Sequence, residues 1–546
     1  MSQSQPEDQP ANAVPVSDDM PPVGGAYAKY VLGVLVLVYA MNFIDRQIIS
    51  ILAEDIKRDL GLSDADLGFL YGTAFAVFYA LFGIPLGRLA DNWVRTRLLS
   101  LGLFVWSAMT ALSGLAGSFT QLSAARIGVG VGEASASPSA FSMLSDWFPK
   151  ERRATALAVY SSGLYIGGGV SLFIGAVVVK AWNAAYPVAG PLGLVGWQAA
   201  FLAVGLPGMV MALWIATLKE PTRGRAEGLP EPPKLAGTEV FRRFIADFIS
   251  VIPPFTLINL ARIDGRALGL NLAAAAGFIA LATLLIRATG DVPQWVAICL
   301  GGYAVTSWSQ SLRHHDKPTW SLIWGTPTFI LALVGFGSIS FAGYSIGFWA
   351  LPYAIRTFVV PMTAAGGVLP WYAHTEIVAL LLGGWGAAGG FLGVVLGGWV
   401  SDWVKKRNPA GRILVASLAT LVPAPFLVMM FTTDSLASFL LFNLPVGLFG
   451  SIYVGIAAAT TQDLVLPRMR GAATATYFIG TTLLGLGLGP YFTGAVSKAS
   501  GSLGTGVLAL LLMAPLTLTC LYFVYRKLPA AESSRIQRAR DAGEPI

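Results

Sequence analysis

The stretch that decides the fold is Gly87-Arg88-Leu89-Ala90-Asp91-Asn92-Trp93-Val94-Arg95-Thr96-Arg97, because it recurs in outline as Gly398-Trp399-Val400-Ser401-Asp402-Trp403-Val404-Lys405-Lys406-Arg407. Each copy follows one long apolar segment and precedes another. A second pair of similar stretches, residues 146–156 and 463–473, is separated by a comparable length of chain. Two matching separations indicate one repeated unit of six helices, as in membrane proteins built from parallel repeats.

The composition excludes a soluble protein. The chain is 55% hydrophobic and 12% charged, whereas soluble domains carry about 25% charged residues. Its glycine content suits membrane helices that approach one another closely. Because basic residues mark the cytoplasmic loops of membrane proteins, the net charge of +7 does not indicate a nucleic-acid partner. The two cysteines lie in apolar segments and predict neither a disulfide nor a metal site.

The apolar segments predict about fourteen membrane spans, because a bilayer core about 30 Å thick needs roughly 20 residues per helix. Six spans form each half and two lie between the halves. The first half gives 28–52, 67–88, 98–118, 122–146, 154–180 and 197–218; the insert gives 267–287 and 293–312; the second half gives 327–349, 374–400, 412–432, 436–462, 472–496 and 504–526. The predicted class is an all-α integral membrane protein with two six-helix bundles, pseudo-two-fold symmetry and two inserted helices.

The same pattern divides the chain into five parts. We expect a disordered N-terminus at 1–26, a first bundle at 27–220, a central linker at 221–324, a second bundle at 325–527 and a short charged tail at 528–546, also disordered. Within the linker, Pro253-Pro254 and flanking arginines favour an interfacial helix near 244–260 over a span.

The distribution of lysine and arginine predicts the orientation of the chain. With the N-terminus inside, basic residues concentrate in alternate loops, including those after the second, fourth, eighth and tenth helices of the repeats. The remaining loops hold few basic residues, among them Lys180, Arg356 and Lys498. This asymmetry predicts a multi-pass protein of the inner cell membrane with both termini in the cytoplasm.

Ionisable residues lie inside two of the predicted spans. The first contains Asn42-Phe43-Ile44-Asp45-Arg46 well within its apolar run, and the fourth contains Arg126 and Glu133 on one helical face. Intramembrane carboxylates usually mark ion or proton paths. We interpret Asp45 and Glu133 as proton-coupling residues, with Arg46, Arg126 and Asn42 lining the cavity; a static salt-bridge network is the alternative.

The duplicated loops suggest gates. Asp91 and Asp402 lie at predicted cytoplasmic helix ends, where a carboxylate can pair with loop arginines or cap a neighbouring helix. We therefore assign a gating role to both loops, through the residues Gly87, Asp91, Arg95, Arg97, Gly398, Asp402 and Arg407.

Other motifs narrow the chemistry. Tyr344 and Trp349 in the seventh core helix are candidates to line the substrate path, with simple packing equally favoured. The chain has no phosphate-binding loop of the Gly-x-x-x-x-Gly-Lys type, no His-Glu-x-x-His and no Cys-x-x-Cys pair. The sequence therefore predicts no cofactor, no metal and no enzyme.

At these motifs the chain resembles the major facilitator superfamily over roughly residues 28–220 and 325–527. Within it, the segment from Asn42 to Arg46 and the segment from Arg126 to Ser135 resemble the spinster-like transporters and their bacterial relatives. The resemblance implies proton coupling through Asp45 and Glu133, and cavity-lining roles for Arg46 and Arg126. It also implies lipid or amphiphile cargo, with organic anions such as sugar acids in nearby groups.

These observations predict a secondary active transporter that works by alternating access. Its expected partners are protons, the bilayer and a small molecule, an amphipathic organic anion or a lipid-like compound, and we expect a monomer. Export of a lysolipid or hydrophobic drug is one alternative. A receptor or scaffold that keeps the fold without transporting is the alternative from another class.

Overall fold

The computed structural model describes residues 20–227, 236–252, 254–263, 265–366 and 368–545, and these are helical with short connections. The predicted all-α class is confirmed. The first half comprises α1 (Ala26–Leu60), α2 (Asp64–Gly68), the π-helix η1 (Phe69–Thr73), α3 (Ala74–Asn92), α4 (Arg95–Ser113), α5 (Phe119–Glu133), α6 (Ala136–Trp147), α7 (Lys150–Ala185), the short 3-10 helix η2 (Pro191–Gly193) and α8 (Gly196–Ala216).

The connecting segment comprises η3 (Arg225–Glu227), α9 (Gly237–Val251), α10 (Thr256–Ile263), α11 (Gly265–Thr289), α12 (Val292–His315) and α13 (Lys317–Ile323). The second half comprises α14 (Pro327–Ala354), the π-helix η4 (Ile355–Val359), α15 (Val360–Ala364), η5 (Trp371–Ala373), α16 (Thr375–Lys405), α17 (Gly411–Leu421), α18 (Pro423–Thr432), α19 (Leu436–Gly450), α20 (Tyr453–Asp463), η6 (Pro467–Met469), α21 (Arg470–Gly480), the π-helix η7 (Thr481–Gly487), α22 (Gly489–Ser500), α23 (Leu503–Leu508), η8 (Ala509–Met513) and α24 (Ala514–Ser533), followed by α25 (Arg535–Asp541).

Twelve helical rods within the described residues are long and apolar enough to cross a membrane. Two further rods accompany them. One is the fourth rod of the first half, which is broken between α5 and α6. The other is α12, which carries polar side chains such as Gln294 and Ser307; the hydroxyl of Ser307 accepts a hydrogen bond from Asn271 of α11. With these two, the number of rods agrees with the predicted total of about fourteen spans.

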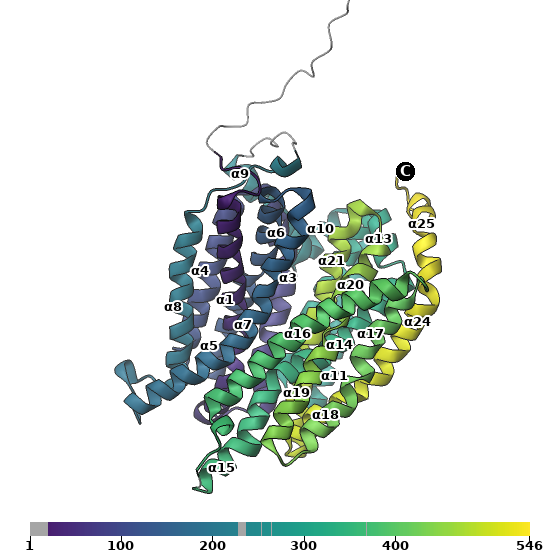
Figure 1. Cartoon of the computed structure of the whole chain (residues 1–546). Coiled ribbons are helices and arrows are strands. Elements are labelled where there is room, and N and C mark those ends of the chain that lie inside the picture. Colours follow the sequence, from purple (N-terminus) through teal and green to yellow (C-terminus); the bar gives the residue numbers. More distant parts are fainter. Residues whose placement is uncertain (1–19, 228–235, 253, 264, 367, 546) are drawn as a thin grey trace, which may run out of the picture.

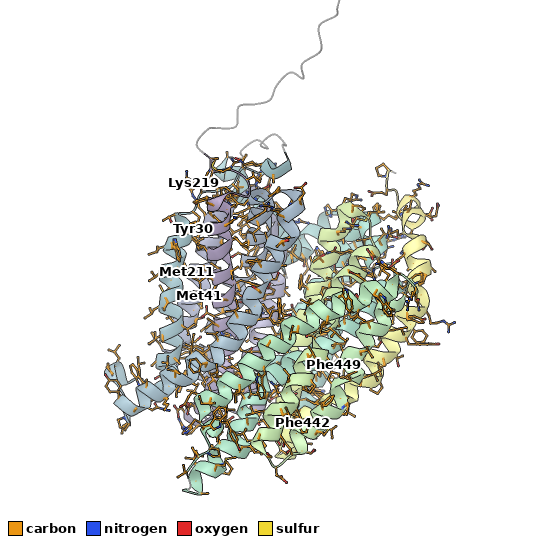
Figure 2. All side chains as sticks on the ribbon, in the orientation of Figure 1. Tyr30, Met41, Met211, Lys219, Phe442 and Phe449 are labelled. Atoms are coloured by element: carbon orange, nitrogen blue, oxygen red, sulfur yellow. The ribbon has the colours of Figure 1, made fainter. Side chains whose placement is uncertain are left out.

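The two halves meet at one end of the molecule and diverge toward the other (Figure 1). The start of α1, α9 and α25 lie at the diverging end, which we call the predicted cytoplasmic end. We call the opposite end, where α15 lies, the predicted outer end. The helices within a half pack closely. Figure 2 shows Met41 of α1 near Met211 of α8 in the first half, and close by the indole Nε1 of Trp214 donates to the hydroxyl of Tyr30 at 2.7 Å.

Glycine permits the close crossing between the halves at the predicted outer end. A Cβ atom added to Gly68 would lie 2.4 Å from the carbonyl oxygen of Pro490, and one added to Gly383 would lie 2.3 Å from that of Gly169. No larger residue fits at such distances without moving a backbone. The glycine-rich segments of the sequence therefore bring α2 against α22 and α7 against α16.

Two sequence expectations need correction. The single helix expected near 244–260 is two helices, α9 and α10, on either side of Pro253-Pro254, because proline interrupts helical hydrogen bonding. The tail expected to be disordered forms the helix α25, which is anchored by hydrogen bonds from Arg538 to Thr326 and from Arg468 to Glu544. At the other terminus, residues 1–19 lie outside the described part of the chain.

Candidate functional site

The intramembrane charges of the first half form one buried cluster. Asn42, Asp45 and Arg46 come from α1, and Arg126 and Glu133 come from α5. Asp45, Arg126 and Glu133 have no solvent-exposed surface at all. The five residues that the sequence singled out in the first and fourth spans therefore lie in one cluster.

Glycine in α5 creates the space for this cluster. A Cβ atom added to Gly130 would lie 2.6 Å from the carbonyl oxygen of Phe75, and one added to Gly132 would lie 2.7 Å from the backbone nitrogen of Trp106. The glycine residues therefore let α5 press against α3 and α4 while its charged face turns toward α1. A larger residue at Gly130 would displace α5 from α3, and one at Gly132 would displace it from α4.

The ion pair between Arg46 and Glu133 is the strongest contact in the cluster. The Nη2 atom of Arg46 donates to Oε2 of Glu133 at 2.6 Å and lies 3.5 Å from Oδ1 of Asn42. The guanidinium carbon lies 4.3 Å from the centre of the Phe75 ring and 5.6 Å from that of Tyr79. A cation held by one carboxylate and aromatic faces is balanced without water.

Asp45 and Arg126 are less completely paired. The Nη1 atom of Arg126 donates to the backbone carbonyl of Asp45 at 3.2 Å, and not to its carboxylate. The carboxylate of Asp45 accepts no hydrogen bond from either arginine; its neighbouring donors are the buried side chains of Trp106 and Thr110. Among the described residues, Nε and Nη2 of Arg126 have no hydrogen-bond partner. Buried polar atoms without partners are costly, so this part of the cluster has reason to rearrange or to exchange a proton.

The two aromatic candidates of the seventh core helix lie in different settings. Tyr344 is half-buried on α14, on the side of the second half that lies near Arg46. Trp349 is fully buried, and its indole Nε1 donates to the carbonyl oxygen of Pro490 at 2.9 Å. Of the two, only Tyr344 is placed to face the charged cluster of the first half in this conformation.

In both halves a basic residue near the duplicated loop forms an ion pair with an acidic residue. That acidic residue lies outside the loop, and is neither Asp91 nor Asp402. Arg95 is fully buried and binds Asp146 at 2.5 Å and Glu220 at 2.7 Å. In the second half Arg412 binds Asp463, the counterpart of Asp146, at 2.8 Å. The loop basic residues therefore bind the carboxylate at the end of the fourth helix of each repeat.

The remaining loop residues are exposed or packed simply. Asp91, Arg97 and Asp402 are exposed. Within the described residues, neither the carboxylate of Asp91 nor that of Asp402 forms an ion pair. Gly87 lies against Pro138, whereas Gly398 has open space around it. The guanidinium of Arg407 lies over the ring of Trp403 at 4.3 Å.

A network at the predicted outer end was missed by the sequence reasoning. Arg356 of η4 donates to both carboxylate oxygens of Asp64 at 2.7 Å and to Glu54 at 2.6 Å. Asp64 also accepts from Lys57 and Ser497, both at 2.6 Å. Arg356 and Ser497 belong to the second half and the other three to the first, so this outer network joins the halves.

Backbone contacts reinforce the junction beneath this outer network. Gln47 and Ser50 on α1 donate to the carbonyl oxygens of Gly347 and Phe348, at 2.7 Å and 2.6 Å. The ring of Tyr71 stacks on Phe348 at 4.3 Å. The signal in the sequence was a lone arginine after an apolar run, but its acidic partners lie about 300 residues away, so no local pattern could pair them.

Comparisons with known proteins agree with this architecture. The family model of the Major Facilitator Superfamily matches residues 35–410. An "MFS-type efflux pump" of Mycolicibacterium smegmatis is 26% identical over 89% of each chain. A "Probable L-galactonate transporter" of Escherichia coli is 33% identical over 31% of this chain and 37% of its own.

A solved structure shows the same fold. It is described as a bacterial homolog to the human lysosomal transporter Spinster in an inward-facing and unoccupied conformation, and it is 24% identical, with a TM-score of 0.64. The alignment covers 94% of this chain and 98% of that one. With two helical bundles, a duplicated loop motif and a family match over most of its length, this multi-pass membrane protein belongs to the Major Facilitator Superfamily, whose members are transporters and not enzymes.

Proposed function

We propose that the protein is a proton-coupled secondary transporter that carries an amphipathic organic anion or a lipid-like small molecule by alternating access. The observation that carries this proposal is the buried cluster in the first half. It combines a tight pair, Arg46 with Glu133, and a fully buried carboxylate, Asp45, that forms no ion pair with either arginine. Such groups within a membrane span are rarely retained without a role in transport.

The geometry supports a specific division of labour. Glu133 accepts the guanidinium of Arg46 at 2.6 Å, so protonation of Glu133 would release that cation toward an anionic substrate. Asp45 reduces the cost of its burial either by holding a proton or by turning toward the free nitrogens of Arg126. The binding of one proton therefore decides whether Arg46 and Arg126 are neutralised by the carboxylates of Glu133 and Asp45 or are free to bind an anionic substrate.

The contacts between the halves support alternating access. In this conformation the outer network of Arg356, Asp64 and their partners holds the predicted outer end together. The ribbons diverge at the predicted cytoplasmic end (Figure 1). Movement to the opposite conformation requires the outer contacts to break and the exposed loop residues Asp91 and Asp402 to find partners across the interface.

The charge of the cluster favours an anion as cargo. Arg46 and Arg126 supply two cations in an apolar setting, and a relative carries a name that refers to a sugar acid. Export of a lysolipid or hydrophobic drug is the second candidate, supported by the efflux pump that is similar along most of the chain. Arg126→Ala is expected to weaken the binding of small acids more than that of neutral ligands, as measured by thermal shift.

The decisive experiment separates proton coupling from substrate exchange. Purified protein is first screened against small organic acids and lysolipids, and the best ligand is used for flux in liposomes. Asp45→Asn is expected to abolish transport driven by a pH gradient while exchange of labelled for unlabelled ligand continues. Asp55→Asn is the matched control, since Asp55 lies on the same helix and pairs with Arg58 at 2.9 Å, outside the cluster.

Two results would count against the proposal. If Asp45→Asn leaves pH-driven transport unchanged, Asp45 has no part in coupling. If the unaltered protein binds ligand but exchanges none across the liposome membrane, the chain is a receptor or scaffold.

We further propose that it functions as a monomer in the inner cell membrane, with both termini in the cytoplasm.

A further inference from the structure

The inserted helix α12 makes hydrogen bonds with both halves. The hydroxyl of Thr73 in the first half bonds to the side chain of Gln294 at 2.6 Å and also to the carbonyl oxygen of Gly487 in the second half. The Nε2 atom of Gln294 lies 3.5 Å from the same carbonyl oxygen. Gln294 is only 1% exposed, so these three groups form a closed polar junction inside the membrane.

A second polar contact lies one turn away, at the start of α12. Asp291 accepts from the hydroxyl of Tyr491 at 2.5 Å and lies 3.6 Å from the ammonium group of Lys498. The ring of Trp295 meets that of Tyr491 edge-on at 5.5 Å. Both partners of Asp291 belong to α22 of the second half, close to the predicted outer end.

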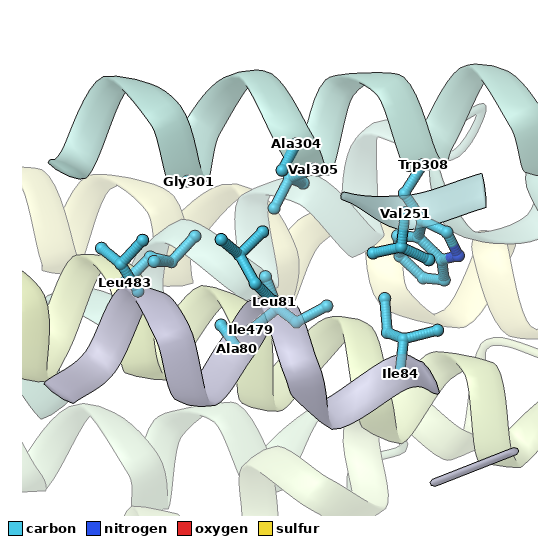
Figure 3. Close-up of a pocket in the computed structure, with 11 residues that line it drawn as sticks. Ala80, Leu81, Ile84, Val251, Gly301, Ala304, Val305, Trp308, Ile479 and Leu483 are labelled. Carbon is cyan, nitrogen blue, oxygen red and sulfur yellow. The ribbon is translucent and has the colours of Figure 1, made fainter. Parts of the chain in front are cut away.

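Apolar contacts continue the bridge along α12. A Cβ atom added to Gly301 would lie 3.3 Å from Val77 of the first half and 3.2 Å from Leu483 of the second. Farther along, a small cavity of about 10 Å³ is enclosed by α3, α12, α9 and α21–η7 (Figure 3). Its lining is apolar apart from the indole nitrogen of Trp308, with Val77 and Ile84 contributed by α3 and Ile479 and Leu483 by the second half.

The attachment of α12 to the two halves is unequal. Its apolar contacts follow α3 from Val77 to Ile84, and the neighbouring α9 is tied to α3 by the ion pair of Arg88 with Asp247. Against the second half, α12 packs its apolar side chains on Leu483 and Ile479, and within the described part of the chain its hydrogen bonds and ion pairs with that half lie near the predicted outer end, at Gly487 and on α22. The helix is therefore built to stay with the first half when the halves separate.

We propose that α12 is a strap that holds α3 and η7–α22 together and thereby stabilises the conformation closed at the predicted outer end. The inference rests on alternating access as the proposed function and assigns the inserted pair of helices a part in it. When the outer end opens, α2–η1 and η7–α22 must part, and the contacts of Gln294 and Asp291 with the second half must break. The strap thus sets how readily the outer end opens.

The proposal is tested by measuring the separation of the outer loops in purified protein without substrate. Spin labels at Leu115→Cys and Asp434→Cys, one on an outer loop of each half, report this distance. The two native cysteines are buried, and labelling of unmodified protein gives the background. Gln294→Leu and Tyr491→Phe are expected to increase the open population, each shifting the ratio of conformations by roughly two- to tenfold for the hydrogen bonds lost.

Matched variants make the outcome decisive. Thr283→Val alters α11, where the hydroxyl of Thr283 only bonds to Ile279 of its own helix, and is expected to leave the distances unchanged. Tyr491→Phe removes one contact of Asp291 from the opposite side, so a folding defect of α12 cannot mimic the effect. Each variant is first shown to be folded by its elution in size-exclusion chromatography. Distances that are then unchanged in Gln294→Leu, Tyr491→Phe and the double variant would overturn the proposal that α12 is a strap. Because no substrate or proton gradient is used, this failure differs from a loss of liposome transport.

Discussion

Arg356→Gln should open the predicted outer end of the transporter. The guanidinium of Arg356 makes three charge-assisted hydrogen bonds to the first half, two to Asp64 and one to Glu54. Asp64 is 5% exposed, so the loss of Arg356 leaves it buried with fewer partners. Lys57 and Ser497 still bind Asp64 at 2.6 Å and soften the loss.

The magnitude follows from these contacts. Breaking a buried ion pair by removing one partner costs about 3–5 kcal/mol. The lower figure, about 3 kcal/mol, applies here because Asp64 keeps two partners and Arg356 is 24% exposed. Since each 1.4 kcal/mol is a factor of about ten in an equilibrium constant, the ratio of outer-closed to outer-open molecules should fall by roughly 100-fold.

The spin-label pair on the outer loops measures this ratio directly. Arg356→Gln is expected to add a long-distance population, and a double-mutant cycle with Asp64→Asn should show coupling, because the two side chains act on the same step. Arg58→Gln is the control, because Arg58 is 70% exposed and its ion pairs are with Asp55 and Asp59 of its own helix, α1. A distance distribution in Arg356→Gln that matches the control would refute the reasoning.

Three further outcomes are expected. Glu133→Gln should shift the pH profile of transport in liposomes, and an unshifted profile would argue for a static pair with its arginine. Arg95→Gln should lower the free energy of unfolding by about 3 kcal/mol, since Asp146 and Glu220 lose their ion pairs with a buried guanidinium and keep backbone hydrogen bonds from Gly224 and Thr96, whereas exposed Arg97→Gln should change stability little. The hydrogen bonds from Arg468 lower the pKa of Glu544 below its ordinary value, so this anchor of the C-terminal helix is present at neutral pH and is lost as the pH falls below about 4. Equal hydrogen-exchange protection factors in α25 at pH 3 and pH 6, each corrected for the intrinsic exchange rate, would contradict this.

Much of the candidate site could be predicted because it depends on local spacing. Arg126 and Glu133 lie on one helical face whatever surrounds them, and Asp45 with Arg46 lies at a fixed depth in an apolar run. The sequence also named their partners as one another. It could not show that Arg126 reaches only the backbone of Asp45 while Arg46 takes the carboxylate of Glu133.

Errors arose where a contact joins distant parts of the chain. The sequence offered Asp91 either to the loop arginines or as a helix cap, and it gave no sign that Arg95 binds Asp146, which only the packing of α4 against α6 brings near. The tail was expected to be disordered because it is charged. Its helix is held by Arg468, which lies 76 residues before Glu544 in the sequence.

By itself, then, the amino-acid sequence determined the bilayer setting, the repeat of six helices and the depth of the charged residues. The bilayer setting and the depth of the charges depend on hydropathy and helical periodicity within single spans, and the repeat depends on duplicated motifs that can be compared directly in the sequence. Only the tertiary structure decided which end of the two halves is joined, through Arg356 and Asp64, and where α12 lies across them. Those features depend on side chains that are hundreds of residues apart, and the energy of such a contact exists only once both helices are in place.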